Sequence, residues 1–251
     1  MFVACSTLCF ANDALEAALL QMADLEFTRA DIAILEGRRQ LKPSEVAANP
    51  ERALRRLRDA SPVTPVAFNV DVQAEGEEYR KQFHAVCRLA KQALVTSVTI
   101  QAAEVGTPFN TEVDRLRELV KIAQSETVLL SVETHVGRMT EDPDTAVELC
   151  RAVPGLGLTL DPSHYICGPH QGKSYTQVIP HVYHVHLRDT SRDKMQVCIG
   201  QGEIEYGRVV GYLQRYDYKR ALSVEIIDRP DNPFDRNTEL RKLRLMLESL
   251  V

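Results

Sequence analysis

Four ionisable residues interrupt apolar segments in the second half of the sequence. Glu133 ends VLLSVE, Asp161 ends GLTLD, and His186 and Glu225 lie near the ends of VYHVHL and ALSVE. Three carboxylates brought together in an apolar interior strongly disfavour one another's ionisation unless an opposite charge is present. A divalent cation would remove this conflict. The oxygen-rich set of three carboxylates and one imidazole suits Mn²⁺, Mg²⁺ or Co²⁺ better than a cysteine-rich structural zinc site does.

Each of these residues has a simpler alternative role. A single acidic residue at the end of a strand is commonly a helix cap or an ion-pair partner. Four such residues at corresponding depth in successive segments favour a shared site, because capping does not require that arrangement. His184 lies on the same face of its segment as His186 but one layer deeper. We therefore expect His184 to be a hydrogen-bonded interior residue and not a ligand.

The elements that would position these side chains alternate regularly. Eight short apolar segments rich in β-branched residues begin near residues 2, 31, 65, 96, 128, 157, 182 and 221. Their spacing is close to one βαβ repeat, about 30 residues. Residues 78–94 and 111–124 carry apolar side chains at three- and four-residue steps, which predicts helices. Asn49–Pro50 and Asp142–Pro143 each place a capping side chain before a proline suited to a first helical turn.

This alternation predicts an α/β fold, a closed (β/α)8 TIM barrel forming one domain over residues 1–251. Functional side chains of such a barrel lie at the carboxyl ends of the strands, where the four ionisable residues are expected. An open dinucleotide-binding sheet is disfavoured because CSTLCFAND, after the first strand, contains no glycine. GPHQGKS has the wrong glycine spacing for a phosphate-binding loop.

Composition and charge narrow the classes of partner. The 251 residues are 44% hydrophobic and 26% charged, as in globular proteins, and the formal net charge is -5. This balance supplies no general attraction to nucleic acid or anionic membranes, so a small metabolite is the expected partner. Six scattered cysteines without a CxxC pair, and an amino-terminal segment without a basic leader, predict a reduced protein of the cytoplasm.

Four motifs carry a family resemblance. SVETH, LDPSH, VHLRD followed by GQGEIEYG, and SVEII occur in this order. With them the sequence resembles the sugar phosphate isomerase/epimerase family of the xylose isomerase-like TIM-barrel superfamily. The resemblance implies that Glu133, Asp161, His186 and Glu225 bind one divalent metal ion, Mn²⁺ in the first place, with Mg²⁺, Co²⁺ or Zn²⁺ as alternatives. It also implies a homodimer or homotetramer.

The resemblance further implies a reaction. Glu133 and Glu225 would act as the acid/base pair on a ketose or sugar phosphate, transferring a proton through a metal-stabilised enediolate. His164, in LDPSH, matches the family's substrate-contacting histidine, although it could instead support Asp161. His135, two residues beyond Glu133, points to the same side and could reach the substrate.

Two arginines are further candidates for substrate binding. Arg188 stands where many family members carry a lysine, and it could instead form an ion pair at the rim with Asp189. Arg192 lies six residues beyond His186, as does a substrate-binding arginine of the tagatose-type epimerases. The sequence IGQG follows Arg192 later than in those enzymes, which is a departure from their pattern.

Three other functions use a similar site. An inosose or 3-dehydroshikimate dehydratase also begins by removing a proton next to a carbonyl group. An abasic-site endonuclease has a similar succession of ligands but needs further zinc ligands, which would fall at Lys194 and Gln196. Neither residue is suitable, and the acidic balance also disfavours DNA binding. An inert sugar-binding barrel is the third alternative.

Overall fold

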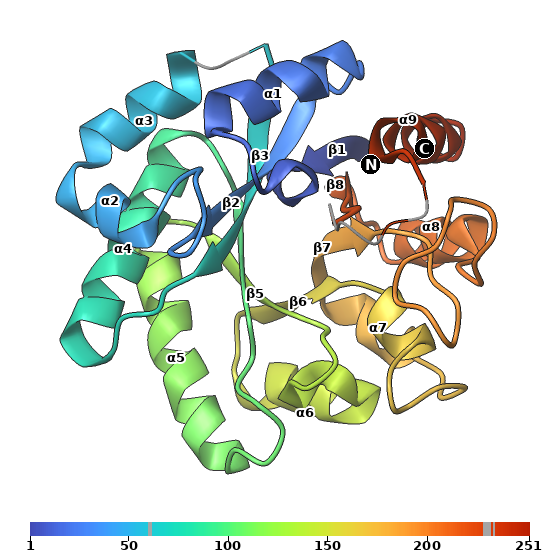
Figure 1. The fold of residues 1–251 in the computed structure, drawn as a ribbon. Helices are drawn as coiled ribbons and strands as arrows, with labels where there is room; N and C mark the ends of the chain where they lie inside the picture. Colours follow the sequence, from blue (N-terminus) through green and yellow to red (C-terminus); the bar gives the residue numbers. More distant parts are fainter. Residues whose placement is uncertain (60–61, 228–231, 233) are drawn as a thin grey trace.

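The computed structural model describes residues 1–59, 62–227, 232 and 234–251. Eight parallel strands form a closed barrel in which each strand pairs with the next and β8 pairs with β1 (Figure 1). The strands are β1 (Phe2–Ser6), β2 (Arg29–Leu35), β3 (Thr64–Asp71), β4 (Ser97–Ile100), β5 (Leu129–Glu133), β6 (Leu156–Leu160), β7 (Val182–Leu187) and β8 (Ala221–Val224). The predicted (β/α)8 barrel is confirmed.

Helices surround the barrel (Figure 1). The α-helices are α1 (Leu15–Asp24), α2 (Pro43–Ala48), α3 (Pro50–Asp59), α4 (Gly76–Gln92), α5 (Phe109–Ser125), α6 (Pro143–Ala152), α7 (Ser163–Ile166), α8 (Tyr206–Arg215) and α9 (Arg236–Glu248). Short 3-10 helices are η1 (Thr7–Phe10), η2 (Met139–Glu141) and η3 (Thr176–His181). Within the described residues, no helix is long and apolar enough to span a lipid bilayer.

Local sequence explains where two of these helices begin. The Asn49 side chain accepts a hydrogen bond from the backbone N–H of Arg52 at 3.0 Å, and Pro50 opens α3. The Asp142 side chain accepts one from the backbone N–H of Asp144 at 3.2 Å, directly before Pro143. Both caps satisfy amide groups that the first helical turn leaves without a partner, as the sequence predicts.

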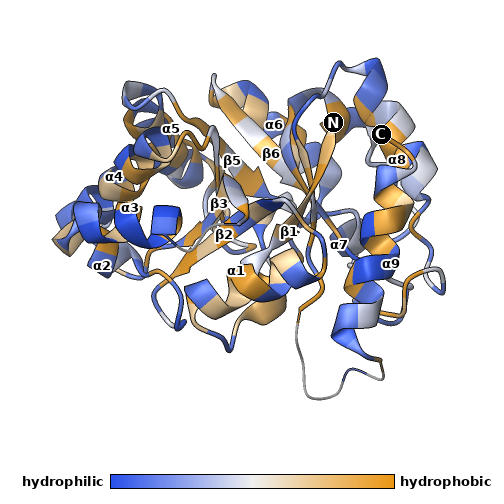
Figure 2. Cartoon of the chain, turned by 90° about the horizontal axis from the view of Figure 1, so that it is seen from above, coloured by the Kyte–Doolittle hydropathy of each residue, from blue (hydrophilic) through white to orange (hydrophobic). Residues whose placement is uncertain are grey.

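The main core lies between the barrel and the helices. Ile32 and Ile34 of β2, Phe83 and Leu89 of α4 and Leu116 of α5 are fully buried members of this apolar cluster. Hydrophobic and hydrophilic residues alternate along outer helices such as α4 and α9 (Figure 2), as expected for helices with one buried face. The apolar layer outside the strands leaves the barrel interior available for polar side chains.

Two irregularities change the strand register near the polar interior. One lies between Ala30 and Asp31 where β2 pairs with β3, and the other lies between Leu158 and Thr159 where β6 pairs with β7. Across the second irregularity, Thr159 pairs with His184. Such bulges increase the local twist and redirect side chains. They therefore affect the positions of Asp31 and His184, both of which are buried.

Candidate metal and active site

The four predicted metal ligands lie at the same end of the barrel. Glu133 is the last residue of β5, and His186 is the next-to-last residue of β7. Asp161 and Glu225 immediately follow β6 and β8. All four side chains are buried. The carboxyl ends of four neighbouring strands therefore concentrate ionisable groups where a barrel of this kind has its active site.

His186 connects two of the carboxylates. Its Nδ1 lies 2.7 Å from Glu133 Oε1 and 3.7 Å from Glu225 Oε2. Ligand atoms of Glu133, His186 and Glu225 lie within 4.8 Å of one another. Glu225 Oε2 is buried and makes no hydrogen bond within the part of the chain that the structure describes. A buried carboxylate oxygen without a partner is unfavourable, so this atom is suited to a cation.

Asp161 has other partners. Its Oδ1 accepts hydrogen bonds from the Ser163 backbone N–H at 2.9 Å and from Ser163 Oγ at 2.6 Å. Its Oδ2 accepts hydrogen bonds from Nε of Arg188 at 3.1 Å and from Nη2 of the same side chain. Both oxygens of Asp161 are therefore occupied by protein groups. The structure brings Glu133, His186 and Glu225 together as possible ligands and pairs Asp161 with an arginine.

Arg188 is a buried cation inside this site. Its Nη2 lies 3.8 Å from Glu225 Oε1 and 3.5 Å from His164 Nε2. The interpretation of Arg188 and Asp189 as an ion pair at the rim is wrong, because Arg188 pairs with Asp161 and lies in the interior. Asp189 instead accepts hydrogen bonds from three backbone N–H groups, those of Thr190, Gly200 and Gly202. The sequence could not show that Arg188 pairs with Asp161, because this pairing depends on the direction of the Arg188 side chain at the end of its strand.

Burial and charge affect the two glutamates in opposite directions. Burial opposes ionisation of Glu133, but the hydrogen bond and positive charge of His186 outweigh it and lower the pKa of Glu133 to about 2. Burial raises the pKa of Glu225, and repulsion from Glu133 adds to this effect, although His186 acts against it. Burial disfavours a charged His186, yet Glu225, Asp31 and Glu133 together raise its pKa well above the usual value.

Arg188 has the corresponding effect on Asp161. Burial opposes the ionised carboxylate, but the charge of Arg188 holds the pKa of Asp161 well below its usual range. The same attraction keeps the pKa of Arg188 above its ordinary value despite burial. Both groups are therefore charged at neutral pH. The guanidinium group of Arg188 places a positive charge beside Glu225.

Two histidines lie beside the Asp161 and Arg188 pair. The rings of His135 and His164 lie with their centroids 4.1 Å apart. His164 Nδ1 accepts a hydrogen bond from the Val136 backbone N–H at 3.2 Å, and its Nε2 lies 3.6 Å from Asp161 Oδ2. Burial lowers the pKa of His164 to about 4. A neutral His164 with Nδ1 as acceptor therefore carries its proton on Nε2.

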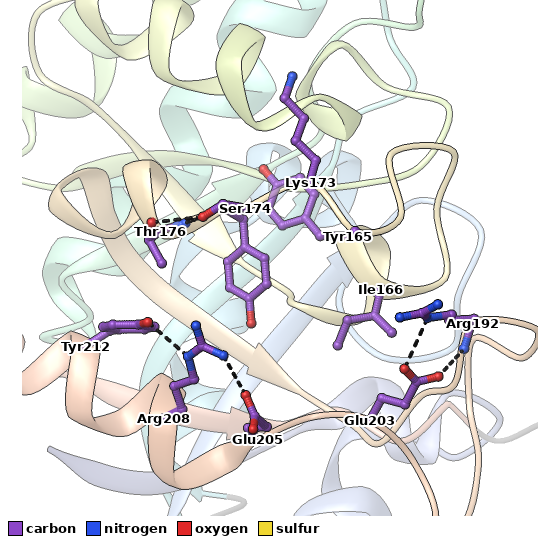
Figure 3. Close-up of a pocket in the computed structure, with 12 residues that line it drawn as sticks. Tyr165, Ile166, Lys173, Ser174, Thr176, Arg192, Glu203, Glu205, Arg208 and Tyr212 are labelled. Atoms are coloured by element: carbon purple, nitrogen blue, oxygen red, sulfur yellow. Dashed lines mark hydrogen bonds and ion pairs between the residues drawn. The ribbon is translucent and has the colours of Figure 1, made fainter.

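Arg192 lies in a different place. It lines a pocket of about 340 Å³, called here the side pocket, between the segment that follows β6 and α8. Figure 3 shows Arg192 with Glu203 on one side of it and Arg208 with Glu205 on the other. Arg192 Nε is 3.3 Å from Glu203 Oε2. The side pocket is lined by none of the four predicted metal ligands, so the structure does not bring Arg192 together with them.

Two residues near the predicted ligands had no role assigned from sequence. Oδ2 of Asp31, on β2, is 2.7 Å from Nε2 of His184 and 2.9 Å from Nε2 of His186. His184 is thus hydrogen-bonded in the interior, as predicted. Gln101, which follows β4, donates a hydrogen bond to Glu133 Oε2. The sequence signal for Asp31 is an acidic residue in the apolar segment DIAILEG, at the predicted first position of a strand.

Buried carboxylates and histidines at the ends of β5 to β8 form a candidate cation site in a closed parallel barrel. Enzymes with this kind of barrel have their active site at the same end. Residues 21–250 match the family model described as Xylose isomerase-like TIM barrel. The chain therefore belongs to the xylose isomerase-like TIM-barrel family. A comparison with curated proteins gives no match.

Solved structures share the fold over the whole chain. A xylose isomerase-like TIM-barrel protein from Mycobacterium smegmatis, in complex with magnesium, is 19% identical with a TM-score of 0.77, covering 100% of this chain and 97% of that chain. A D-allulose 3-epimerase from Methylomonas sp. is 14% identical with a TM-score of 0.72, covering 100% and 98%. The probable 3-DHS dehydratase of petrobactin synthesis from Bacillus anthracis is 14% identical with a TM-score of 0.74, covering 99% of each chain.

Proposed function

We propose that the protein is a divalent-metal-dependent isomerase or epimerase acting on a ketose or sugar phosphate. One observation carries this proposal: ligand atoms of Glu133, His186 and Glu225 converge in a buried cluster in which Glu225 Oε2 makes no hydrogen bond within the described residues. Carboxylate oxygens with one imidazole nitrogen fit Mn²⁺ and also Mg²⁺, Co²⁺ or Zn²⁺. The family and the epimerases among the similar folds support the choice of substrate class.

Glu133, His186 and Glu225 would hold the cation. Asp161 would join them only after separating from Arg188, because both of its oxygens already accept hydrogen bonds. When bound, the cation supplies positive charge that makes a carbon next to a substrate carbonyl group more acidic.

The two glutamates would move the proton. Glu133 and Glu225 come from β5 and β8, on either side of His186 from β7. One carboxylate removes the proton from the carbon next to the carbonyl, which leaves an enediolate, and the other carboxylic acid returns a proton. Return to the opposite face of the same carbon gives an epimer, and return to the neighbouring carbon gives an isomer.

Arg188, His164 and His135 are the proposed substrate contacts. Arg188 carries guanidinium donors beside Glu225, and a neutral His164 presents Nε2 on the same side. Both can donate hydrogen bonds to oxygens that gain negative charge during proton removal. Arg192 would contact only a part of the substrate that reaches the side pocket.

Isotope exchange tests the proposal. The protein would be incubated with Mn²⁺ and a panel of ketoses and ketose phosphates in D₂O, and deuterium in the sugars would be followed by mass spectrometry and NMR. Stable incorporation into a ketose or its epimer is the expected result. Loss of water to give an unsaturated carbonyl product would identify a dehydratase instead. Absence of both with every sugar of the panel, in the presence of Mn²⁺, would contradict the proposal.

A further inference from the structure

Asp31 places a carboxylate in the barrel interior from a distant strand. β2, which carries Asp31, and β7, which carries His184 and His186, are not neighbours, because β8 and β1 lie between them. Asp31 is completely buried, and its Oδ1 has no hydrogen-bond partner among the residues that the structure describes. The register shift between Ala30 and Asp31 lies directly beside this side chain. A buried charge in this position needs partners of opposite charge or good donors.

Both histidines of β7 supply such donors. Nε2 of His184 and Nε2 of His186 lie 2.7 Å and 2.9 Å from the same oxygen, Asp31 Oδ2. The two rings are perpendicular, with centroids 5.0 Å apart. At these distances a carboxylate oxygen accepts a hydrogen bond from each ring nitrogen, so each histidine carries a proton on Nε2.

This hydrogen bond determines which nitrogen of His186 is turned towards the two glutamates. With Nε2 bound to Asp31, Nδ1 points to Glu133 Oε1 at 2.7 Å and to Glu225 Oε2 at 3.7 Å. A histidine that binds a metal commonly donates its other N–H to a carboxylate, which fixes the orientation and tautomer of the ring. His184 bonds to the same carboxylate, but among the described residues it is His186 whose ligand atoms lie close to those of both Glu133 and Glu225.

We infer that Asp31 is a positioning residue that fixes the His186 ring so that Nδ1 is the metal-binding atom, with His184 as the second donor that holds Asp31 in place. The inference rests on the proposed metal-dependent function. Asp31, His184 and His186 could alternatively bind a second cation, since their ligand atoms also lie close together. That set has one carboxylate, and both imidazoles already lie within hydrogen-bonding distance of its Oδ2, whereas the set of Glu133, His186 and Glu225 has two carboxylates and one imidazole and so has the greater need of a cation.

The test uses Zn²⁺, which is diamagnetic, and the full chain labelled with ¹⁵N in its histidines. Long-range ¹H–¹⁵N spectra distinguish protonated, unprotonated and metal-bound ring nitrogens, and the His186 signals are assigned by their loss in His186→Gln. We expect one Zn²⁺ per chain, bound through Nδ1 of His186, with a proton on Nε2. Binding through Nε2, or a second Zn²⁺ that disappears in His184→Gln, would overturn the inference.

Variants test the consequence for affinity. Asp31→Asn keeps the side-chain shape but removes the charge, and we expect zinc affinity to fall about 10- to 100-fold. Thr99→Val is the matched control, since it changes a buried polar residue of the barrel interior that does not contact His186, and its zinc affinity should equal that of the wild type. Circular dichroism checks that each variant is folded.

The outcomes separate this inference from the proposed function. A wild-type protein that binds zinc while Asp31→Asn binds it equally well would overturn the role of Asp31 and leave the metal-dependent function standing. A wild-type protein that binds neither Zn²⁺ nor Mn²⁺ would overturn both. If Asp31→Asn does not fold, the nitrogen assignment in the wild type still decides which atom binds the metal.

Discussion

The two halves of the barrel share one architecture but differ in charge. The half from β5 to β8 ends in Glu133, Asp161, His186 and Glu225, all buried at the same end. In the half from β1 to β4, the buried acidic residue on the strands is Asp31, which bonds to histidines of the other half. The barrel is therefore regular, but its ionisable site is not. The repulsion between buried carboxylates at the strand ends is confined to the half from β5 to β8, called here the charged half.

Polar residues of the two halves also meet in an uncharged cluster. Oγ1 of Thr159, on β6, lies 2.7 Å from Oγ1 of Thr99 on β4 and 2.7 Å from Oγ of Ser131 on β5. These three buried hydroxyls satisfy one another without any ion. The comparison shows that buried polarity by itself does not mark the reactive centre. Buried carboxylates that depend on an arginine, a histidine or a cation do.

The largest expected effect comes from the charged half. Glu133→Gln and Glu225→Gln each keep an oxygen acceptor but remove the base, so proton exchange should fall about 10²- to 10⁴-fold while the barrel remains folded. Deuterium incorporation measures the loss, and circular dichroism measures the fold. Exchange at the wild-type rate in both variants would remove the functional distinction between the halves.

Arg188→Met should strongly reduce the stability of the protein, because it acts on the ionisable residues at the ends of β5 to β8. It leaves the carboxylate of Asp161 buried without its main counter-charge, which typically reduces the free energy of unfolding by about 3–5 kcal/mol. Urea unfolding measures the change. The double variant Arg188→Met with Asp161→Asn should be more stable than the single variant, because the unpaired charge is gone. Equal stability of the two would show that the pair contributes by packing alone.

Thr99→Val tests the uncharged cluster. The variant removes a hydrogen bond to Thr159 at 2.7 Å and a longer one to Ser131 at 3.4 Å, so we expect a loss of about 1 kcal/mol in the free energy of unfolding and no change in proton exchange. Thermal or urea unfolding, with the exchange assay alongside, checks both. A loss of activity as large as that of Glu133→Gln would mean that the uncharged cluster also controls the reactive residues.

The smallest effect is expected at the exposed side pocket. Arg192→Ala removes an ion pair with Glu203 in which the Arg192 side chain is 65% exposed, so the free energy of unfolding should change by less than about 0.5 kcal/mol. If Arg192 contacts substrate, KM should rise and kcat should stay the same. Unchanged KM for every active sugar would remove Arg192 from the proposed substrate contacts.

The sequence predicted the fold well because its evidence is local. Apolar segments of strand length alternate with amphipathic ones, and capping residues such as Asn49 and Asp142 mark helix starts. The position of Glu133 and Glu225 was also predictable, since each interrupts or ends an apolar strand and parallel strands bring their carboxyl ends together.

Partners within the site were not predictable in the same way. The pairing of Arg188 with Asp161 depends on the direction of a long side chain between neighbouring strand ends. The role of Asp31 is not visible in the sequence, because the apolar segment predicts a strand that starts near residue 31, whereas β2 begins at Arg29 and places Asp31 within the strand. The position of Arg192 depends on a loop with no periodic pattern to reveal its path.

The hydrogen bonds of Asp189 also have a thermodynamic consequence. This carboxylate accepts hydrogen bonds from backbone N–H groups at both ends of the segment between β7 and α8. The donors are Thr190 at one end and Gly200 and Gly202 at the other. A Cβ atom at position 202 would lie 2.0 Å from Asp189 Oδ1, so glycine allows the close approach. These hydrogen bonds order the segment that carries Arg192 when the protein folds. The conformational entropy of the segment is therefore lost before a ligand binds, and its ordering does not reduce the affinity for that ligand.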